Sequence, residues 1–164
     1  MRTVGAIAVV AGTLLGTACA TSYQRTGLTG GFKDTQLAPD VFRVSFSGNA
    51  YTSVDRVQDF VLLRAAELTL ANNFKFFAVI NSSDQSRTET SVTSGSAHTT
   101  GEVFAPGGVG TYSGTTTYSP PQVTTRYKPG VGMTIRAFQN KPDDIFAFDA
   151  AFIARAIRSK YGIE

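Results

Sequence analysis

Apolar and polar positions begin to alternate at Phe42. Phe42, Val44 and Phe46 are separated by polar residues, and this period of two is typical of a strand with one buried face. Residues 74–80 form a nearly continuous apolar run, which is consistent with a strand buried on both faces. We therefore predict strands at 42–47 and 74–80.

A helical pattern lies between these two strands. Thr52, Ser53 and Asp55 provide a hydroxyl cap and an acid, a variant of the capping box. Apolar residues then recur at helical spacing over residues 57–68, and Asn72-Asn73 suit a left-handed helix end. Strand, helix and strand with short links predict a βαβ unit, with a right-handed crossover if its strands are parallel.

The C-terminal part repeats both patterns. Residues 131–138 alternate and predict a core strand. Pro142, Asp143 and Asp144 predict the start of a last helix, which Gly162 ends. The expected buried stripe of that helix is Ile145, Phe148, Phe152 and Ala156, widened by Phe146, Ile153 and Ile157.

The composition changes sharply over residues 81–130, where more than half of the residues are Ser, Thr or Gly. This segment is either a disordered low-complexity insert or a long hairpin in which 86–104 return as 111–127. We favour strands near the body that fray into a mobile tip. The glycines at 107–110 are interpreted as turn residues, because no lysine and no helix follow as in a phosphate-binding loop.

The N-terminus has the features of a secretory signal. Arg2 supplies a positive start, residues 4–15 are apolar, and the small residue Ala18 precedes Cys19. This apolar run is too short to span a bilayer, which takes about 20 residues. Leu14 to Cys19 resembles a lipobox, in which the cysteine becomes the lipidated first residue of the mature protein.

Cys19 is the only cysteine in the chain, so an exported form has no internal disulfide. We therefore predict a signal peptide at 1–18 and lipidation of Cys19. Ala20, rather than aspartate, resembles the sorting signal for the outer membrane. Residues 19–38 are interpreted as a lipidated tether, whose 20–38 part would span roughly 22–26 Å as a flexible coil.

Composition restricts the classes of partner. The residues after the signal suffice for one domain with a core, to which the chain's 12 phenylalanines contribute. The net charge is +3, but the charges are scattered without a basic run. We therefore expect no nucleic-acid partner.

No residue constellation predicts catalysis or a cofactor. His98 is the only histidine and stands in a polar segment, which favours a solvent-exposed side chain. No Cys, His or Asp cluster has metal-ligand spacing, and no nucleophile elbow is present. Asp143, Asp144 and Asp149 could suggest a cation site, but the first two are explained by the expected helix start. We expect a protein that is not an enzyme.

Two other features have alternative interpretations. Arg64 and Glu67 form either an ordinary intrahelical ion pair, which we favour, or a group in which a partly buried Glu67 pairs across the fold. Tyr112, Tyr118 and Tyr127 are either a surface for sugars or a protein partner, or cross-strand pairs.

Four segments carry a resemblance: YTS at 51–53, LLRAAELTL at 62–70, FFAVI at 76–80 and MTIRAF at 133–138. Together they resemble a small family of proteobacterial lipoproteins that has no assigned function, with the Ser/Thr/Gly-rich segment matching the family's most variable part. The resemblance implies structural motifs, and no functional residue follows from it.

We predict an α+β fold over residues 39–164, with a mostly antiparallel sheet of about four to six strands and two helices on one face, and a polar hairpin or flexible insert at about 82–130. The predicted function is a non-enzymatic outer-membrane lipoprotein that serves as an envelope interaction or structural module. The alternative is a periplasmic lipoprotein that binds a small molecule or glycan.

Overall fold

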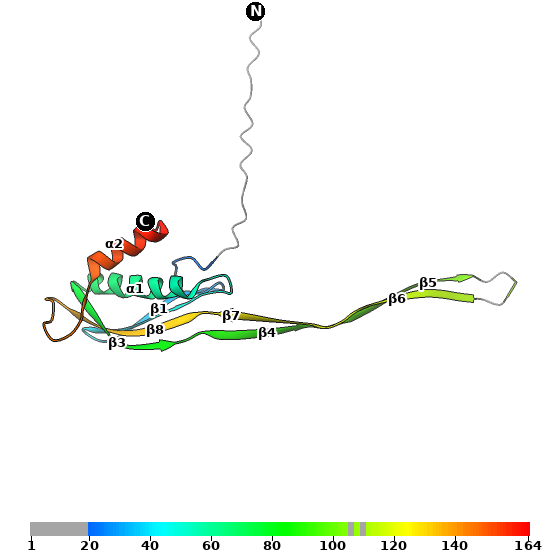
Figure 1. Ribbon diagram of the computed structural model, residues 1–164, viewed down its shortest axis with the longest axis horizontal. Coiled ribbons are helices and arrows are strands. Elements are labelled where there is room, and N and C mark those ends of the chain that lie inside the picture. The colour runs from blue at the N-terminus through cyan, green and yellow to red at the C-terminus, as the bar shows by residue number, and fades with distance from the viewer. Residues whose placement is uncertain (1–19, 105–106, 109–110) are drawn as a thin grey trace, which may run out of the picture.

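A five-stranded antiparallel sheet forms the base of the helix-covered part of the protein, which we call the body (Figure 1). The structure is a computed structural model that describes residues 20–104, 107–108 and 111–164. The strand order is β1-β2-β8-β3-β9. The predicted α+β fold is therefore confirmed. The strands are β1 (Gly31–Ala38), β2 (Val41–Ser47), β3 (Phe76–Asp84), β8 (Gly130–Phe138) and β9 (Phe148–Asp149).

Two helices lie on the same side of this sheet, one above the other (Figure 1). Helix α1 (Val54–Ala71) packs against β2, β8 and β3, and α2 (Ala150–Tyr161) packs against α1. Phe60 of α1 joins the layers, since its ring contacts Phe46 of the sheet at 5.1 Å and Tyr161 of α2 at 4.9 Å between centroids. The body thus has three layers, with α1 in the middle.

The two faces of the sheet differ because side chains alternate along each strand. Phe42, Val44 and Phe46 of β2 are buried under α1, as the period of two predicted. On the opposite face, Arg43 pairs in register with Thr134 and Ser45 with Gly132. One face therefore carries the core, and the other is largely polar.

The predicted βαβ unit is present, with another strand inserted in it. Both β2 and β3 pair antiparallel with β8, so they run parallel to each other on either side of it. The strand expected at 74–80 is less buried than predicted, because a bulge lies between Val79 and Asn81 and leaves Ile80 exposed.

The predicted start of the last helix is wrong. Residues 142–147 contain no helix, and Phe148 instead pairs with Phe77 at the sheet edge. Asp149 caps α2, accepting a hydrogen bond from the Phe152 backbone N–H at 2.9 Å. The predicted stripe is wrong at most positions, because Ile145, Phe146 and Phe148 precede the helix and Phe152 and Ala156 are exposed. In the predicted wider arc, Ile157 is buried and Ile153 packs against the core. The other buried residues of α2 are Ala150 and Ala154.

The predicted flexible tether also needs correction. Residues 31–38 form β1, which pairs with β2 along its length. Residues 20–30 are joined to the body by hydrogen bonds: the Phe32 backbone N–H donates to the Gln24 carbonyl at 2.8 Å, and Thr21 is buried. The order comes from contacts with distant residues, which a glycine-containing polar composition does not reveal.

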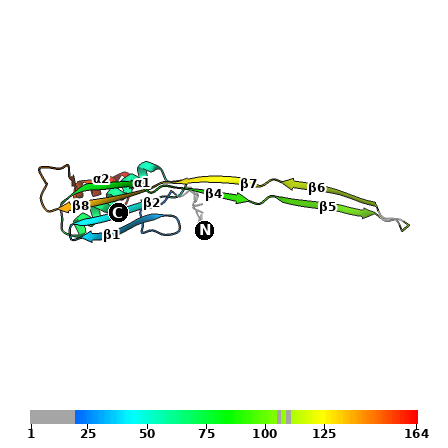
Figure 2. The same ribbon diagram turned by 90° about the horizontal axis from the view of Figure 1, so that it is seen from below.

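The segment rich in Ser, Thr and Gly forms a long two-stranded projection from the body (Figures 1 and 2). We call it the arm: β4 (Arg87–Thr93), β5 (Ser96–Phe104), β6 (Thr111–Ser119) and β7 (Gln122–Lys128). The hairpin interpretation is confirmed, and pairing continues to Phe104 and Thr111. The predicted tip includes 105–106 and 109–110, which lie outside the described residues.

Candidate functional site

The arm is one hairpin with a constant register. Thr93 pairs with Gln122, and three residues further along each strand Ser96 pairs with Ser119, so no residue is inserted between the two ladders. Pairing is interrupted where Pro120 and Pro121 lie, because proline has no N–H to donate. At about 3.3 Å per residue, the 7 residues of β4 and the 9 residues of β5 together extend about 53 Å. Their main contacts are with β7 and β6 rather than with the body.

Each ladder of the arm has a more apolar and a more polar face, because directly opposed residues share a face. Near the body, Val92 lies opposite Val123 and Thr88 opposite Tyr127. In the outer ladder the more apolar face consists of Ala97, Thr99, Gly101, Val103, Tyr112, Gly114, Thr116 and Tyr118. The arm therefore combines threonine methyl groups and tyrosine rings in a stripe open to solvent.

The structure does not gather the three candidate tyrosines into one site. Tyr112, Tyr118 and Tyr127 are 60%, 66% and 50% exposed. Tyr112 lies across the Gly101–Gly114 pair, where a Cβ on either glycine would collide with its ring. Tyr118 shares that face of the outer ladder, whereas Tyr127 stands near the root of the arm. The first two tyrosines thus belong to the arm surface and the third to its root.

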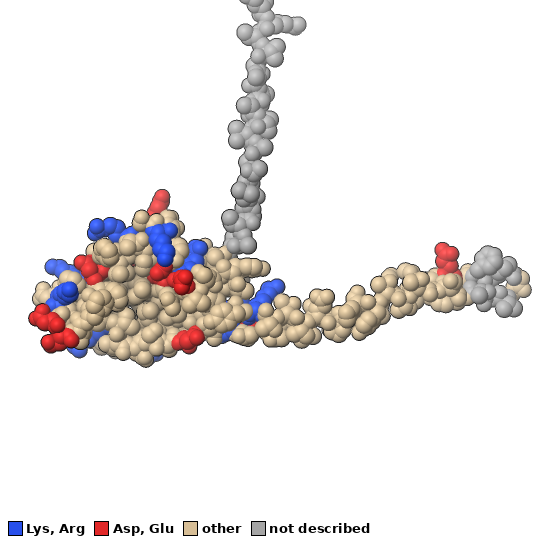
Figure 3. All heavy atoms as spheres, in the orientation of Figure 1, with Lys and Arg blue, Asp and Glu red and all other residues tan. Residues whose placement is uncertain are grey.

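Charge is confined almost entirely to the root of the arm, as Figure 3 shows. Lys128 and Glu89 form an ion pair at 2.6 Å, and this hydrogen bond lowers the pKa of Glu89. The sequence from Thr90 to Thr125 contains one charged residue, Glu102, when His98 is counted as neutral. His98 is exposed opposite Thr117. Within the described residues, no group of three His, Cys, Asp or Glu side chains could hold a metal ion.

A groove lies at the root of the arm, beside the start of α1. Its volume is about 310 Å³. Apolar side chains from three parts of the fold meet in it, among them Leu62, Val131 and Met133, and Asp84 and Tyr127 add polar groups. The Ser86 backbone N–H donates to Asp84 at 2.8 Å, and hydrogen bonding from Ser86 lowers the pKa of this carboxyl. No sequence pattern predicted this groove, since the residues that line it are far apart along the chain.

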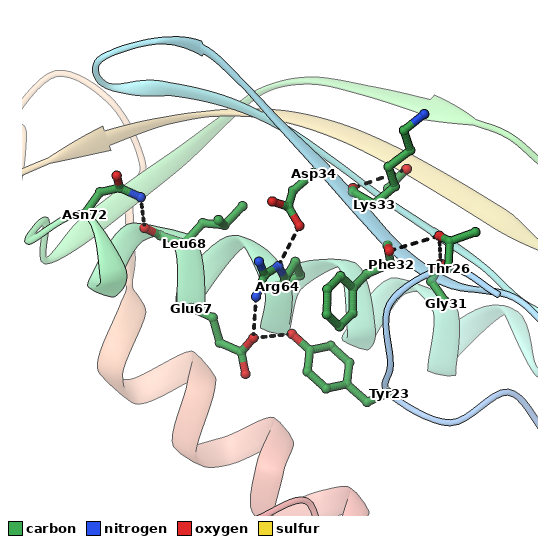
Figure 4. Close-up of polar contacts among 11 residues, drawn as sticks. Tyr23, Thr26, Gly31, Phe32, Lys33, Asp34, Arg64, Glu67, Leu68 and Asn72 are labelled. Atoms are coloured by element: carbon green, nitrogen blue, oxygen red, sulfur yellow. Dashed lines mark hydrogen bonds and ion pairs between the residues drawn. The ribbon is translucent and has the colours of Figure 1, made fainter.

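Glu67 pairs across the fold, as the less favoured of the two interpretations proposed. Its carboxylate accepts hydrogen bonds from the Tyr23 hydroxyl and from Arg64 at 3.3 Å (Figure 4). It also accepts a hydrogen bond from Arg158 of α2 at 2.8 Å. The intrahelical pair with Arg64 is therefore present as well. Burial and then the bond to Glu67 raise the pKa of Tyr23 above its ordinary range.

Arg64 extends this network to the sheet. Its Nε donates to Asp34 of β1 at 3.0 Å, and its guanidinium lies 4.5 Å from the centroid of the Phe32 ring (Figure 4). Burial opposes the charged form of Arg64, but the bond and the charge of Asp34 leave its pKa raised. These hydrogen bonds link the N-terminal segment, β1 and α2 to α1.

The remaining predicted site residues are not brought together. Cys19, the predicted lipidation residue, lies outside the described residues. Asp149 caps α2, while Asp143 and Asp144 lie in the preceding loop. Neither helix of the described part is long and apolar enough to cross a membrane.

Comparison with known proteins adds no relative. No family model matches the chain, and no curated protein and no solved structure matches it. The resemblance to a lipoprotein family stays a prediction.

Proposed function

We propose that this chain is a non-enzymatic bacterial lipoprotein, anchored through Cys19 in the periplasmic leaflet of the outer membrane, whose arm binds an envelope partner protein. The observation that carries the proposal is the arm. It extends away from the body (Figures 1 and 3), and its side chains face solvent along most of its length.

An isolated two-stranded ribbon is at best marginally stable in water. No other strand pairs with either edge of the arm in the described residues, so both edges present backbone N–H and C=O groups. Proteins usually protect such edges with charge, proline or bulges. Here the described strands of the arm contain no proline, the pair Pro120-Pro121 lies between β6 and β7, and charge is nearly absent beyond the root. A partner that adds a strand would satisfy these groups and cover the stripe of tyrosine and threonine.

The anchor supports the same function from the sequence. A cysteine at the end of a signal-like segment, with no second cysteine in the chain, is explained by lipidation. Because lipoproteins of this type carry more than one acyl chain, attachment would be stable. The body would then be held at the membrane surface, and the arm would extend from it.

The experiment is site-specific photocrosslinking in intact cells of the native bacterium. A photoreactive phenylalanine analogue replaces Tyr112, Tyr118 or, as the control on the body, Phe146. We expect the same discrete protein adduct from Tyr112 and Tyr118 and no such adduct from Phe146. Cys19→Ser should leave the protein soluble or as an unprocessed precursor, and should remove the adduct.

A shortened arm provides the matched control. Replacing residues 94–121 with Asn-Gly joins the paired residues Thr93 and Gln122 by a two-residue hairpin turn. This variant should fold and remain in the membrane fraction, yet fail to compete with the full chain for the adduct. The arm proposal is contradicted if the shortened chain competes equally, or if adducts from the arm are as diffuse as those from Phe146. The anchor proposal is contradicted if Cys19→Ser remains a processed membrane protein.

A second candidate function is binding of a small molecule or glycan, which the groove at the root of the arm favours. The sequence contains no tryptophan, so Leu62→Trp would place a single fluorescent reporter in the groove. We expect the tryptophan fluorescence of Leu62→Trp to change saturably when an N-acetylglucosamine oligosaccharide or a fatty acid is added. The fluorescence of Phe146→Trp should not change in this way. No saturable change with either ligand at millimolar concentration would reject this candidate for both classes.

A further inference from the structure

We propose that the body contacts the lipid surface directly, through two turns that flank the point where the chain enters the fold. These are residues 27–30 and 49–52, which we call the entry surface. The inference rests on the Cys19 anchor of the proposed function. It differs from the predicted flexible tether, because the body contacts the bilayer directly.

The first argument is the fixed position of Thr21. Its side chain is buried, its backbone N–H donates to Thr52 Oγ1 at 2.9 Å, and its hydroxyl donates to the Thr29 carbonyl at 2.6 Å. The Asn49 backbone N–H donates to Thr21 Oγ1 at 2.9 Å. Since consecutive Cα atoms are about 3.8 Å apart, the two residue steps that separate positions 19 and 21 span at most about 7.6 Å. A lipidated Cys19 therefore leaves no room for a spacer.

The second argument is the chemistry of the two turns around Thr21. Leu28 stands at the tip of the turn closed by the Gly27–Gly30 bridge and is fully exposed, at 109%. Tyr51 lies in the other turn and is 66% exposed, while its backbone N–H donates to the Asn49 side chain at 3.0 Å. A leucine and a tyrosine held outward on tight turns suit the boundary between acyl chains and headgroups.

Basic side chains lie beside these turns. Arg87 and Lys128 line the same hollow as Leu28 and Asn49. Lys128 also pairs with Glu89 at 2.6 Å. Cations at this level attract anionic headgroups, and the attraction decays within a Debye length.

The anchor and the turns reinforce each other. Two apolar side chains bind a bilayer weakly by themselves, but an adjacent lipid anchor makes their contact intramolecular. The occupant is therefore a phospholipid surface rather than a protein, because the acyl chains of Cys19 would hold that surface next to Thr21.

The arm begins at this same end of the body (Figures 1 and 2). The Gly48 backbone N–H, next to the second turn, donates to the carbonyl of Pro129 at the root of the arm at 2.8 Å. Contact at the entry surface would thus restrict the rotation of the body and set the direction of the arm relative to the membrane.

The test uses the absence of tryptophan from the sequence. Leu28→Trp and Tyr51→Trp are made in the full, lipidated chain and reconstituted into vesicles of phosphatidylcholine with a fifth of phosphatidylglycerol. Lipids brominated near the headgroup quench any indole that reaches them. Phe146→Trp is the matched control, since Phe146 is exposed in the loop between β8 and β9. That loop lies at the end of the body away from the arm (Figure 1).

We expect at least twofold stronger quenching for Leu28→Trp and Tyr51→Trp than for Phe146→Trp, and a blue-shifted emission. Vesicle flotation separates the two ways of failing. Chain that floats with the vesicles but shows equal quenching at all three positions overturns the entry surface and leaves the anchor intact. Chain that does not float overturns the anchor and the inference together. Tryptophans at 28 and 51 shielded by a second copy, without quenching by lipid, would also overturn it.

Discussion

At the scale of single residues, Glu67 shows how one carboxylate joins elements distant in sequence. It accepts from Tyr23, Arg64 and Arg158, which come from the N-terminal segment, α1 and α2. Hydrogen bonds to a charged group contribute about 1.5–3 kcal/mol each when buried, and less where solvent screens them. Glu67 is partly buried, so these hydrogen bonds stabilise the contacts among the three elements.

Tyr23→Phe should alter the alkaline limb of the stability profile. The pKa of Tyr23 is raised in the folded state, so folding favours its protonated form. The corresponding stability is present below the unfolded pKa of about 10 and is lost as the pH rises above it. Tyr23→Phe lacks this loss, although it should be about 1–2 kcal/mol less stable at neutral pH because Glu67 loses a donor.

The measurement is urea unfolding at a series of pH values from about 7 to 11. At each pH, the free energy of unfolding of the variant is compared with that of the parent. Tyr51→Phe serves as the control, because Tyr51 is exposed. A Tyr23→Phe difference that stays constant across this range would contradict the role assigned to the hydroxyl.

At the scale of elements, the position of α2 was decided by its neighbours. Sequence signals placed its start at 142–144, yet Phe148 pairs with Phe77, and their rings stack at 5.3 Å between centroids. The apolar residues at 145 and 146 therefore lie in the loop before β9, and the residue at 148 lies in β9 itself. A cap signal shows where a helix can begin, and packing selects among such places.

Asp149→Ala should destabilise the body by about 1 kcal/mol, because it removes the side chain that accepts from the Phe152 N–H. Asp143→Ala and Asp144→Ala are matched controls from the predicted helix start and should change the free energy of unfolding by less than about 0.5 kcal/mol. Chemical denaturation of the three variants tests this. Equal losses for all three would mean that the helix begins earlier than the structure shows.

At the scale of the whole molecule, the body and the arm are stabilised by different interactions. The body buries aromatic and aliphatic side chains between a sheet and two helices, whereas the arm depends on its ladder and on pairs such as Thr99 and Thr116, whose hydroxyls are 2.9 Å apart. Regions with few buried apolar contacts open at low free energy. The arm should thus open without unfolding the body.

Hydrogen exchange should protect the amides of α1, β2 and β8 most and those of β5 and β6 least. Limited proteolysis should cut first between about Ser94 and Thr117, and the shortened arm should melt at the temperature of the full chain. First cuts within Val57–Leu70 would mean that this division into body and arm is wrong. A lower melting temperature of the shortened chain would show that the arm stabilises the body.

The sequence by itself determined the local elements of this protein. Alternation at 42–47 and 131–138 and helical spacing at 57–68 correspond to β2, β8 and α1, because a two- or 3.6-residue period records which side of an element is buried. The hairpin was one of two interpretations of the segment rich in Ser, Thr and Gly, and strands near the body were favoured because threonine is a good strand former.

The tertiary structure alone decided what depends on contacts between distant residues. Thr21 is buried against Thr52, β1 replaces part of the expected tether, and Glu67 gains Tyr23 and Arg158. The groove at the root of the arm is of the same kind, because its walls come from α1, β3, β7 and β8. No periodicity records these neighbours, since which segments meet is a property of packing rather than of local sequence.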